Sequence, residues 1–415
     1  MNDVTIARQS CRVCGAPMPL TFADLGMIPL CQRYTTADHL DQGEMFYPLH
    51  ARVCTQCLYV GIPELLRPEE IFSEYAYFSS YSMSWIDYVE RSVATMVDSY
   101  SLDARSQVIE MASNDGYLLQ FFVARGIPAL GVEPAANVAK VANDKGIPTL
   151  ARFFNLETAT DLHAEGMRAD LLLAYNCLDH VPDIHGVVAG LKLLLKPHGV
   201  IHVEVPYLRS LVEENQFDTI YHDRLSYLSF RCASRIFQLN GLRVFDVERV
   251  PTHGGSIRIR ACHIDDAARP SLPSVASLLA EEEACGMTAP EYYTSYMHRV
   301  AEVKHELLTF LIGLKREGHS IVGYGVPPKG NVLLNHCGIR GDLIDYLVDR
   351  SPYKVGKYAP GTLLPICDVD RIRATRPSRV FILPWNIKDE IIGQMSFVRE
   401  WGGAFFVAIP HVQVL

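Results

Sequence analysis

The sequence predicts an α/β protein with a cysteine-rich N-terminal domain followed by two doubly wound, Rossmann-like units. Two observations support this prediction. Two Cys-x-x-Cys pairs lie within the first 72 residues. Two later stretches, which begin near residues 107 and 320, each alternate short hydrophobic strands with helices and end a strand in an acidic residue. This order is typical of parallel sheets covered by helices on both faces. We therefore expect domains at 1–72, 73–265 and 266–415.

Length and composition exclude several classes of protein. A chain of 415 residues is too long for one core, because domains usually contain about 100–200 residues. The net charge is −9 and no basic run is present, so no nucleic-acid partner is expected. We see no signal-peptide core and no apolar run of about 18 residues that would span a membrane. We expect a cytoplasmic monomer whose 11 cysteines are reduced or bound to a metal.

The paired cysteines predict a metal site in the N-terminal domain. Cys11 and Cys14 form one Cys-x-x-Cys pair, and Cys54 and Cys57 form the other. Four thiolates in this pattern suit tetrahedral Zn²⁺ and leave no open coordination position, so we expect a structural zinc ion. A redox-active pair and chance spacing are the alternatives. The scattered cysteines are expected to be small core residues.

The central unit begins with a helix expected over 81–97 and a strand expected at 108–110. The strand follows from the buried character of Val108 and Ile109, with Glu110 at its end. Later hydrophobic segments predict further alternation and a terminal antiparallel pair. The other expected elements are helices over 117–125, 184–195 and 233–240, and strands at 131–133, 171–173, 200–204, 242–250 and 256–262.

The turn after the first strand predicts the ligand of the central unit. It consists of small residues, and Glu133 follows about 20 residues later, as in dinucleotide-binding units. Gly116 is its only glycine, however, and Glu110 and Asp115 would repel a phosphate. Carboxylates suit a ligand with a ribose and a positive charge. We expect S-adenosylmethionine, with Glu133 on the ribose and Glu110 and Asp115 near the sulfonium. A purely structural turn is the alternative.

The third domain begins with an acidic helical stretch over 272–317 and then alternates again. Strands are expected at 320–325, 346–349, 379–383 and 404–409. Lys329 follows a glycine-rich turn at a helix start, which suits a pyrophosphate. Asp349 ends the next strand, where it would reach ribose hydroxyls. Lys354 and Lys357 add charge. Trp385 and Asn386, just past a strand, would contact a base or sugar. A structural turn with solvated lysines is the alternative.

Longer motifs then complete the pattern. They occupy residues 24–30, 77–82, 110–116, 176–183, 217–222, 253–256, 323–331 and 348–352. Together with the cysteine pairs and the two α/β units, in this order, they resemble the sugar C-methyltransferases of deoxysugar biosynthesis. The resemblance covers nearly the whole chain. It implies methyl transfer from S-adenosylmethionine to a carbon next to the ketone of a nucleotide-linked keto-deoxysugar.

The resemblance also implies a role for each matching residue. The cofactor site would be lined by Glu110, Ala112, Ser113, Asn114, Asp115 and Gly116, with Glu133 and Pro134 at the ribose and adenine. Asn176 and His180 would face the cofactor and the reaction centre. Tyr77, Phe78 and Ser80 would close the site from the zinc-domain side. The C-terminal unit would hold the nucleotide-sugar through Tyr324, Lys329, Asn331, Asp349, Tyr353 and Lys357.

The chain departs from the family at the segment that resembling enzymes use for the catalytic base. The usual Tyr-His-Glu-His pattern reads Tyr221, His222, Asp223, Arg224 here. Arginine stays protonated, so Arg224 cannot be the base. We expect the base to be Tyr221, His222 or His180, with the first two preferred. Tyrosine would need its pKa lowered, which Arg224 could do.

Arg224 itself has three possible roles. It could stabilise an enolate oxygen, bind a substrate carboxylate, or form a tolerated ion pair with Asp223 or Glu204. Asp179 adds a charge beside His180 and could raise its pKa. Because of this replacement, two alternatives to methyl transfer stay open. One is a non-methylating epimerisation or elimination that uses bound S-adenosylmethionine, and the other is a non-catalytic binding protein.

Overall fold

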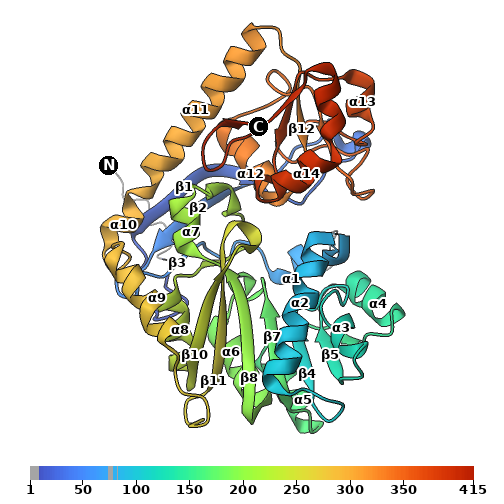
Figure 1. Cartoon of the computed structure of the whole chain (residues 1–415). Helices are drawn as coiled ribbons and strands as arrows, with labels where there is room; N and C mark the ends of the chain where they lie inside the picture. The colour runs from blue at the N-terminus through green and yellow to red at the C-terminus, as the bar shows by residue number, and fades with distance from the viewer. Residues whose placement is uncertain (1–8, 73–77, 82) are drawn as a thin grey trace.

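A computed structural model of the chain describes residues 9–72, 78–81 and 83–415 and, within these ranges, contains three β-sheets. In Figure 1 the seven-stranded sheet forms the lower half of the molecule and the six-stranded sheet the upper half, while β1 and β2 lie between them. The α/β class with two Rossmann-like units is confirmed. No helix in the described part of the chain is both long and apolar enough to cross a membrane.

The N-terminal domain contains a four-stranded antiparallel sheet that the sequence did not reveal. Its strands lie in the order β1 (Leu20–Pro29), β2 (Phe46–Val53), β3 (Val60–Gly61) and β9 (Ser226–Tyr227). The register of β1 on β2 shifts twice, so β1 lacks the regular alternation that marks a strand in sequence. The chain before residue 83 also contains η1 (Ala37–His39), α1 (Pro68–Phe72) and η2 (Ser79–Tyr81), of which α1 and η2 lie next to the central unit (Figure 1). The fourth strand comes from the middle of the chain.

The central sheet has the order β10-β11-β8-β7-β4-β5-β6. Every strand and helix expected for this unit is present, but the helix expected over 117–125 is shortened to four residues, Gln120–Val123, because its ends form turns. The strands are β4 (Val108–Met111), β5 (Ala129–Val132), β6 (Thr149–Leu150), β7 (Ala169–Tyr175), β8 (Leu195–Pro206), β10 (Leu242–Val250) and β11 (Ser256–His263). The helices are α2 (Met83–Tyr100), α3 (Gln120–Val123), α4 (Ala136–Asp144), α5 (Leu156–Ala164), α6 (Ile184–Leu194), α7 (Leu208–Glu213) and α8 (Phe230–Leu239).

The strand order fixes where this unit binds its ligand. The strands β4 to β8 are parallel, and β4 pairs with β5 on one side and β7 on the other. The chain therefore reverses its winding direction between β4 and β7. In open α/β sheets, ligands bind beyond the carboxyl ends of the strands at such a switch point. The expected antiparallel pair, β10 and β11, closes the opposite edge.

The C-terminal unit repeats the same design on a smaller scale, with the strand order β14-β13-β12-β15-β16-β17. Its strands are β12 (Ile321–Tyr324), β13 (Leu347–Val348), β14 (Ile366–Cys367), β15 (Arg379–Ile382), β16 (Ala404–Val407) and β17 (Gln413–Val414). Its helices are α11 (Tyr296–Arg316), α12 (Pro328–Cys337), α13 (Arg371–Thr375) and α14 (Lys388–Gln394), with η6 (Trp385–Ile387) and η7 (Ser396–Trp401). Two helices precede this unit: α9 (Pro273–Ala284) packs on α8 and β10 of the central unit, and α10 (Pro290–Thr294) packs on β1. The long helix α11 runs up one side of the molecule (Figure 1).

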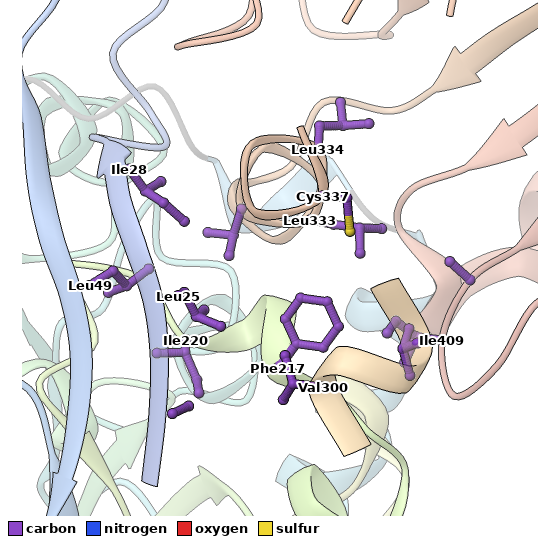
Figure 2. Close-up of a cluster of buried hydrophobic side chains, with 14 of the residues drawn as sticks. Leu25, Ile28, Leu49, Phe217, Ile220, Val300, Leu333, Leu334, Cys337 and Ile409 are labelled. Atoms are coloured by element: carbon purple, nitrogen blue, oxygen red, sulfur yellow. The ribbon is translucent and has the colours of Figure 1, made fainter. Parts of the chain in front are cut away.

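One hydrophobic core joins the N-terminal sheet to the C-terminal unit. Figure 2 shows α12 packed between β1, the segment that carries η4 (Phe217–Thr219) and the C-terminal strands. Its labelled side chains come from regions far apart in the sequence: Leu25, Ile28, Leu49, Phe217, Ile220, Val300, Leu333, Leu334, Cys337 and Ile409. The packing therefore crosses the domain limits expected from the sequence, and those limits stay a prediction.

Candidate active site and zinc site

A cleft of about 370 Å³ opens at the carboxyl ends of β4, β5 and β7, at the predicted switch point. Six residues expected around the cofactor line it, namely Ala112, Asn114, Glu133, Pro134, Asn176 and His180. Aromatic side chains contribute much of the remaining wall, from Trp85, Tyr117, Phe153, Phe154 and Tyr175. Aromatic faces and carboxylates attract a sulfonium, and amide groups suit a nucleoside. The donor set therefore fits S-adenosylmethionine.

Left-handed backbone conformations gather around this cleft. The structure describes nine non-glycine residues with positive φ, and four of them line the cleft: Ala112, Asn114, Asn176 and His253. Such conformations cost about 1–3 kcal/mol each and persist only where the surrounding structure holds them, often at functional sites. The strain thus coincides with the turns that follow β4 and β7 and with the turn between β10 and β11.

Glu133 is the one acidic residue of the cofactor motif that reaches the cleft. Its two carboxylate oxygens accept hydrogen bonds from the backbone N–H groups of Asn114, at 3.0 Å, and Ala135, at 2.9 Å. Burial raises the pKa of Glu133 to about 7. The side chain therefore fixes the turn after β4 to the end of β5 and lies on the cleft wall where a ribose would be expected.

Four residues of the same motif lie behind the cleft wall, in contrast to what the family resemblance implied: Glu110, Ser113, Asp115 and Gly116. Glu110 shares the face of β4 that carries Val108, whereas Met111, on the other face, lines the cleft. Burial raises the pKa of Glu110 well above its usual range. Neither Glu110 nor Asp115 is therefore placed to meet a sulfonium directly.

Asp115 instead connects residues 79–80 to the turn after β4. Its carboxylate accepts hydrogen bonds from Ser80 Oγ and from Lys145 Nζ, the latter at 3.1 Å. The backbone N–H of Ser79, a cleft residue, donates to Asn114 Oδ1 at 2.9 Å. Ser80 therefore lies next to the cofactor motif because its hydroxyl donates to Asp115. Tyr77 lies outside the described residues.

Phe78 connects the central unit to the C-terminal unit. It packs on Ala135 and Val138 of the α4 region and stacks on the ring of Tyr353, with centroids 5.7 Å apart. Tyr353 remains half exposed. The family resemblance assigned Phe78 to the cofactor and Tyr353 to the nucleotide-sugar. The two rings meet at the interface between the central and C-terminal units, which we call the seam.

His180 is the histidine of the predicted reaction centre that lines the cleft. It ends the short helix η3 (Leu178–His180) after β7. Its Nδ1 lies 2.5 Å from the carbonyl oxygen of Asp223. A carbonyl only accepts, so Nδ1 carries the proton and Nε2 carries the lone pair. Nε2 lies 3.8 Å from the carboxylate of Asp179.

Arg224 is buried and paired with Asp179. Its Nε lies 2.9 Å from Asp179 Oδ2, and its guanidinium lies over the ring of Tyr221, 4.9 Å from the centroid. The ion-pair interpretation named Asp223 or Glu204 as the partner, and it was wrong on that point. Asp223 accepts from Gln32 Nε2 at 3.2 Å, and Glu204 binds Arg258.

Tyr221 and His222 were preferred as the catalytic base, but neither has both a suitable pKa and a place on the cleft wall. Burial raises the pKa of Tyr221 far above its usual range and outweighs the opposing effect of Arg224, so the expected lowering is wrong. The ring of His222 faces Tyr47 on β2, with centroids 6.0 Å apart, and does not line the cleft. Its orientation is decided by the N-terminal sheet, which pattern-based reasoning had not detected.

Lys329 lies at the seam between the two Rossmann-like units. Its Nζ donates to Asn386 Oδ1 at 2.8 Å and lies 4.5 Å from the centre of the Trp385 ring. Trp385 Nε1 in turn donates to Asp218 Oδ2 at 2.7 Å. Burial lowers the pKa of Lys329 to about 8, against the effect of Asp218, and burial raises the pKa of Asp218 to about 6. Lys329 and Asn386 are thus brought together, as expected for one subsite.

Other residues expected to hold the nucleotide-sugar have structural partners. Asn331 is fully buried, and its Nδ2 donates to the carbonyl of Cys31 at 2.6 Å, so it joins α12 to the N-terminal domain rather than facing a ligand. Asp349 accepts from the N–H groups of Val326 and Ser351, both at 2.8 Å, and from Lys354. Two further residues were expected to contact the nucleotide-sugar. Tyr324 is buried at the end of β12, and Lys357 is half-buried in the loop after β13.

The four predicted cysteines meet in the N-terminal domain. Their sulfur atoms all lie within 4.8 Å of one another. Backbone N–H groups point at two of the sulfurs, from Val13 to Cys11 and from Gln56 to Cys54, each at 3.4 Å. Amide hydrogen bonds to sulfur stabilise thiolates, and four thiolates complete a tetrahedral Zn²⁺ site. The donor set therefore fits structural zinc.

The zinc site supports the segment that carries Arg224. After the second cysteine pair, Tyr59 OH bonds Ser226 Oγ at 2.7 Å and donates to the carbonyl of Leu225 at 3.1 Å. Strand β3 then pairs with β9, Val60 with Tyr227. The N-terminal domain thus fixes the end of the 221–227 segment, which lies against the cleft through the contact between Asp223 and His180.

Several cleft residues were missed by sequence reasoning. Phe153, Phe154 and Asn155 follow β6, which is too short to recognise from a hydrophobic pattern. Trp85 comes from α2, and Tyr117 lies in the turn that precedes α3. His253 belonged to a recognised motif to which no role was assigned. The rule that ligands lie beyond strand ends would have found 153–155 once β6 was known.

Three family models match the chain. They are described as "Putative zinc binding domain" over residues 11–72, "Methyltransferase domain" over 84–247 and "C-methyltransferase C-terminal domain" over 251–410. With the cleft and the cysteine cluster, they define an S-adenosylmethionine-dependent methyltransferase with a zinc-binding domain. The cofactor is S-adenosylmethionine, and the metal is Zn²⁺.

One relative shows the family to which the chain belongs. The C-methyltransferase NovU of Streptomyces niveus is 34% identical over 417 residues, which cover 100% of this chain and 99% of that protein. The chain belongs to this family of C-methyltransferases and transfers a methyl group to carbon. The non-methylating alternatives are thereby set aside.

Similar solved structures include an S-adenosylmethionine-dependent methyltransferase from Clostridium acetobutylicum, with 10% identity and a TM-score of 0.34 over 42% of this chain and 90% of that one. Magnesium protoporphyrin IX methyltransferase from Synechocystis matches with 15% identity and a TM-score of 0.33 over 43% of this chain and 79% of that one.

The expected monomeric state stays a prediction.

Proposed function

We propose that the enzyme methylates the carbon next to the ketone of a nucleotide-linked keto-deoxysugar through an enolate. The observation that carries this proposal is His180, a cleft residue whose hydrogen bond to the Asp223 carbonyl leaves Nε2 free of a proton. A carbon acid requires a base within hydrogen-bond reach of its proton. The proposed ketone provides the acidity that such a carbon needs.

His180 takes the proton in this mechanism. The proton moves from the substrate carbon to Nε2, and the electron pair of the broken C–H bond becomes the enolate. Asp179, 3.8 Å from Nε2, stabilises the imidazolium that forms. Arg224 holds Asp179 through the 2.9 Å contact and so orients this carboxylate. On this view the arginine that replaced the family histidine acts as a positioning residue.

The cleft orients the second substrate. When bound, S-adenosylmethionine supplies an electrophilic methyl group and keeps the electron pair of its broken C–S bond. Glu133 and the amide side chains of Asn114 and Asn176 fix the nucleoside, and the aromatic wall excludes water. Holding both reactants in line supplies a large part of the rate enhancement.

We propose that the seam between the units receives the nucleotide. Lys329, with Asn386 beside it, provides a cation and an amide for the pyrophosphate and sugar. Trp385, beside Asn386, lies against Gly254, which follows the cleft residue His253, so a substrate bound at Lys329 would extend from the seam toward the cleft. Tyr353, stacked on Phe78, would border its entrance.

The test is a coupled assay with wild-type enzyme, S-adenosylmethionine and a set of nucleotide-linked sugars. A 4-keto sugar should yield S-adenosylhomocysteine and a product that has gained one CH₂ unit by mass. The matched control is the same sugar with its ketone reduced to an alcohol, which should not react. His180→Gln should lose turnover by about 10²–10⁴-fold, the range of general-base contributions. Equal methylation of the alcohol, or full activity of His180→Gln, would contradict the proposal.

A further inference from the structure

His253 lies in the cofactor cleft, together with His180, but belongs to a different part of the fold. It is the middle residue of η5 (Thr252–Gly254), the turn between β10 and β11. Its ring packs edge-on against Trp85, another cleft residue, with centroids 5.4 Å apart. The mechanism described above gives this histidine no role.

The turn holds His253 in an unfavourable backbone conformation. Its φ is 54° and its ψ is 21°, in the left-handed region that side chains with a Cβ rarely adopt. Thr252 Oγ1 donates to Glu204 Oε1 at 2.7 Å, and Gln216 Nε2 donates to the carbonyl of Gly254 at 2.6 Å. The N–H of Gly255 closes the turn on the Thr252 carbonyl at 2.9 Å. The surrounding structure thus imposes a strained position that points to function.

Burial and nearby cations keep the imidazole of His253 neutral. Burial, followed by the nearby cations Lys329 and Arg224, lowers its pKa to about 3. At neutral pH the ring therefore carries one N–H donor and one acceptor nitrogen. Its neighbours oppose a second proton, so it is poorly suited to be the base. His180, by contrast, has the Asp179 carboxylate within 3.8 Å to stabilise its protonated form.

We infer that His253 is a further catalytic residue, whose neutral imidazole donates a hydrogen bond to the substrate oxygen that becomes the enolate oxygen. The inference rests on the proposed function. A neutral imidazole among cations is a strong donor that leaves its own proton in place as negative charge develops on oxygen. Arg224 already pairs with Asp179, and Lys329 with Asn386, so His253 supplies a donor that these cations do not.

The test uses two variants that both tolerate a left-handed backbone, His253→Asn and His253→Gly. Asparagine keeps a neutral N–H donor, whereas glycine removes it. Three quantities are measured for each: kcat and KM for the keto-sugar, affinity for S-adenosylhomocysteine, and the rate at which the hydrogen next to the ketone exchanges with D₂O when S-adenosylhomocysteine is bound. The exchange rate reports enolate formation without methyl transfer.

His253→Gly should lower kcat and the exchange rate together by about 10²–10³-fold, the usual effect of losing one oxyanion donor, with little change in KM or in S-adenosylhomocysteine affinity. His253→Asn should recover about tenfold of this loss, because part of the donor's contribution returns. The inference is overturned if His253→Gly behaves as wild type, if both variants lose equal activity, or if S-adenosylhomocysteine affinity falls in step with kcat.

The proposed function fails in a distinguishable way. In that case wild-type enzyme itself would neither exchange the hydrogen nor release S-adenosylhomocysteine with any nucleotide-linked ketone, and the inference would fall with it. If wild-type enzyme exchanges and methylates while the glycine variant is unaffected, only the role of His253 is lost.

Discussion

Arg224 Nε lies 2.9 Å from Asp179 Oδ2, and both side chains are almost completely buried, at 9% and 3% exposure. The family resemblance implies a histidine at the position that Arg224 occupies. On the other side of the same carboxylate lies His180, 3.8 Å away. The Asp179 carboxylate thus lies between a permanent cation and a histidine.

Breaking this pair should cost stability. Arg224→Met leaves the Asp179 carboxylate buried without its partner, and loss of one member of a buried pair typically costs about 3–5 kcal/mol. Urea unfolding at neutral pH measures this change. The double variant Arg224→Met, Asp179→Asn should regain most of the loss, because no buried charge remains. A single variant as stable as wild type would show that the pair is solvated.

The same pair should affect turnover through His180. In Asp179→Asn the imidazolium formed during proton removal loses its carboxylate, so kcat should fall while KM for the keto-sugar changes little, because the charge develops only in the reaction. Steady-state kinetics checks this split. A mainly raised KM would instead indicate that this cluster binds a group of the substrate in the ground state.

Glu133 should make both stability and cofactor affinity depend on pH. Its pKa rises from an ordinary 4.5 to about 7 on folding, so between these values the folded protein holds a proton that the unfolded chain has lost. Stability of the cofactor-free protein is therefore fully present below about pH 4.5 and falls as pH rises to about 7. In Glu133→Gln this part of the pH dependence of the free energy of unfolding should disappear.

Affinity for S-adenosylhomocysteine should change in the opposite direction. Ribose hydroxyls donate best to the ionised carboxylate, so affinity should rise as pH passes about 7. At pH 8, Glu133→Ala should weaken binding by about 2 kcal/mol, as expected for hydrogen bonds to a charged group. Calorimetry at pH 6 and pH 8 measures both effects, with Glu133→Gln as the control that keeps the length of the side chain but cannot ionise. A pH-independent affinity would remove Glu133 from the ribose.

Lys329 should bind the nucleotide-sugar only in its charged form. Since its pKa is lowered to about 8, KM for the sugar nucleotide should rise as pH passes that value, while affinity for S-adenosylhomocysteine stays constant. Lys329→Met should show the high KM at all pH values. Lys354→Met is a matched control, because Lys354 is held by Asp349 and the Val326 carbonyl. An equal effect of both variants would point to a general charge effect.

Removal of zinc should impair turnover more than cofactor binding. Elemental analysis should find about one zinc per chain in the native enzyme. Chelation frees the Cys54 pair that precedes Tyr59 and β3, so the 221–227 segment loses its anchor at Ser226. We expect a lower Tm and a large loss of kcat, with a smaller loss of S-adenosylhomocysteine affinity. Full turnover in zinc-free protein would contradict this coupling.

Features that depend on residues close together in the chain were predictable from sequence. The Cys-x-x-Cys spacing predicted the cluster of Cys11, Cys14, Cys54 and Cys57, because each pair forms one local knuckle. The buried strands that end at Glu110 and Glu133 predicted β4 and β5, and strand ends meet at one sheet edge whatever the rest of the chain does. The role of His180 was implied by the family resemblance, and the residue lies at the same edge because the short helix η3 follows β7.

Contacts between distant segments became apparent only in the folded protein. Asn331 was expected at the substrate but donates to Cys31, 300 positions earlier. His222 faces Tyr47 because β1 and β2 form a sheet that irregular register hides in the sequence. The orientation of Arg224 toward Asp179, and the meeting of His253 with His180 in one cleft, depend on packing between non-local elements. Local pattern carries no information about such partners, since burial and pairing are properties of the assembled core.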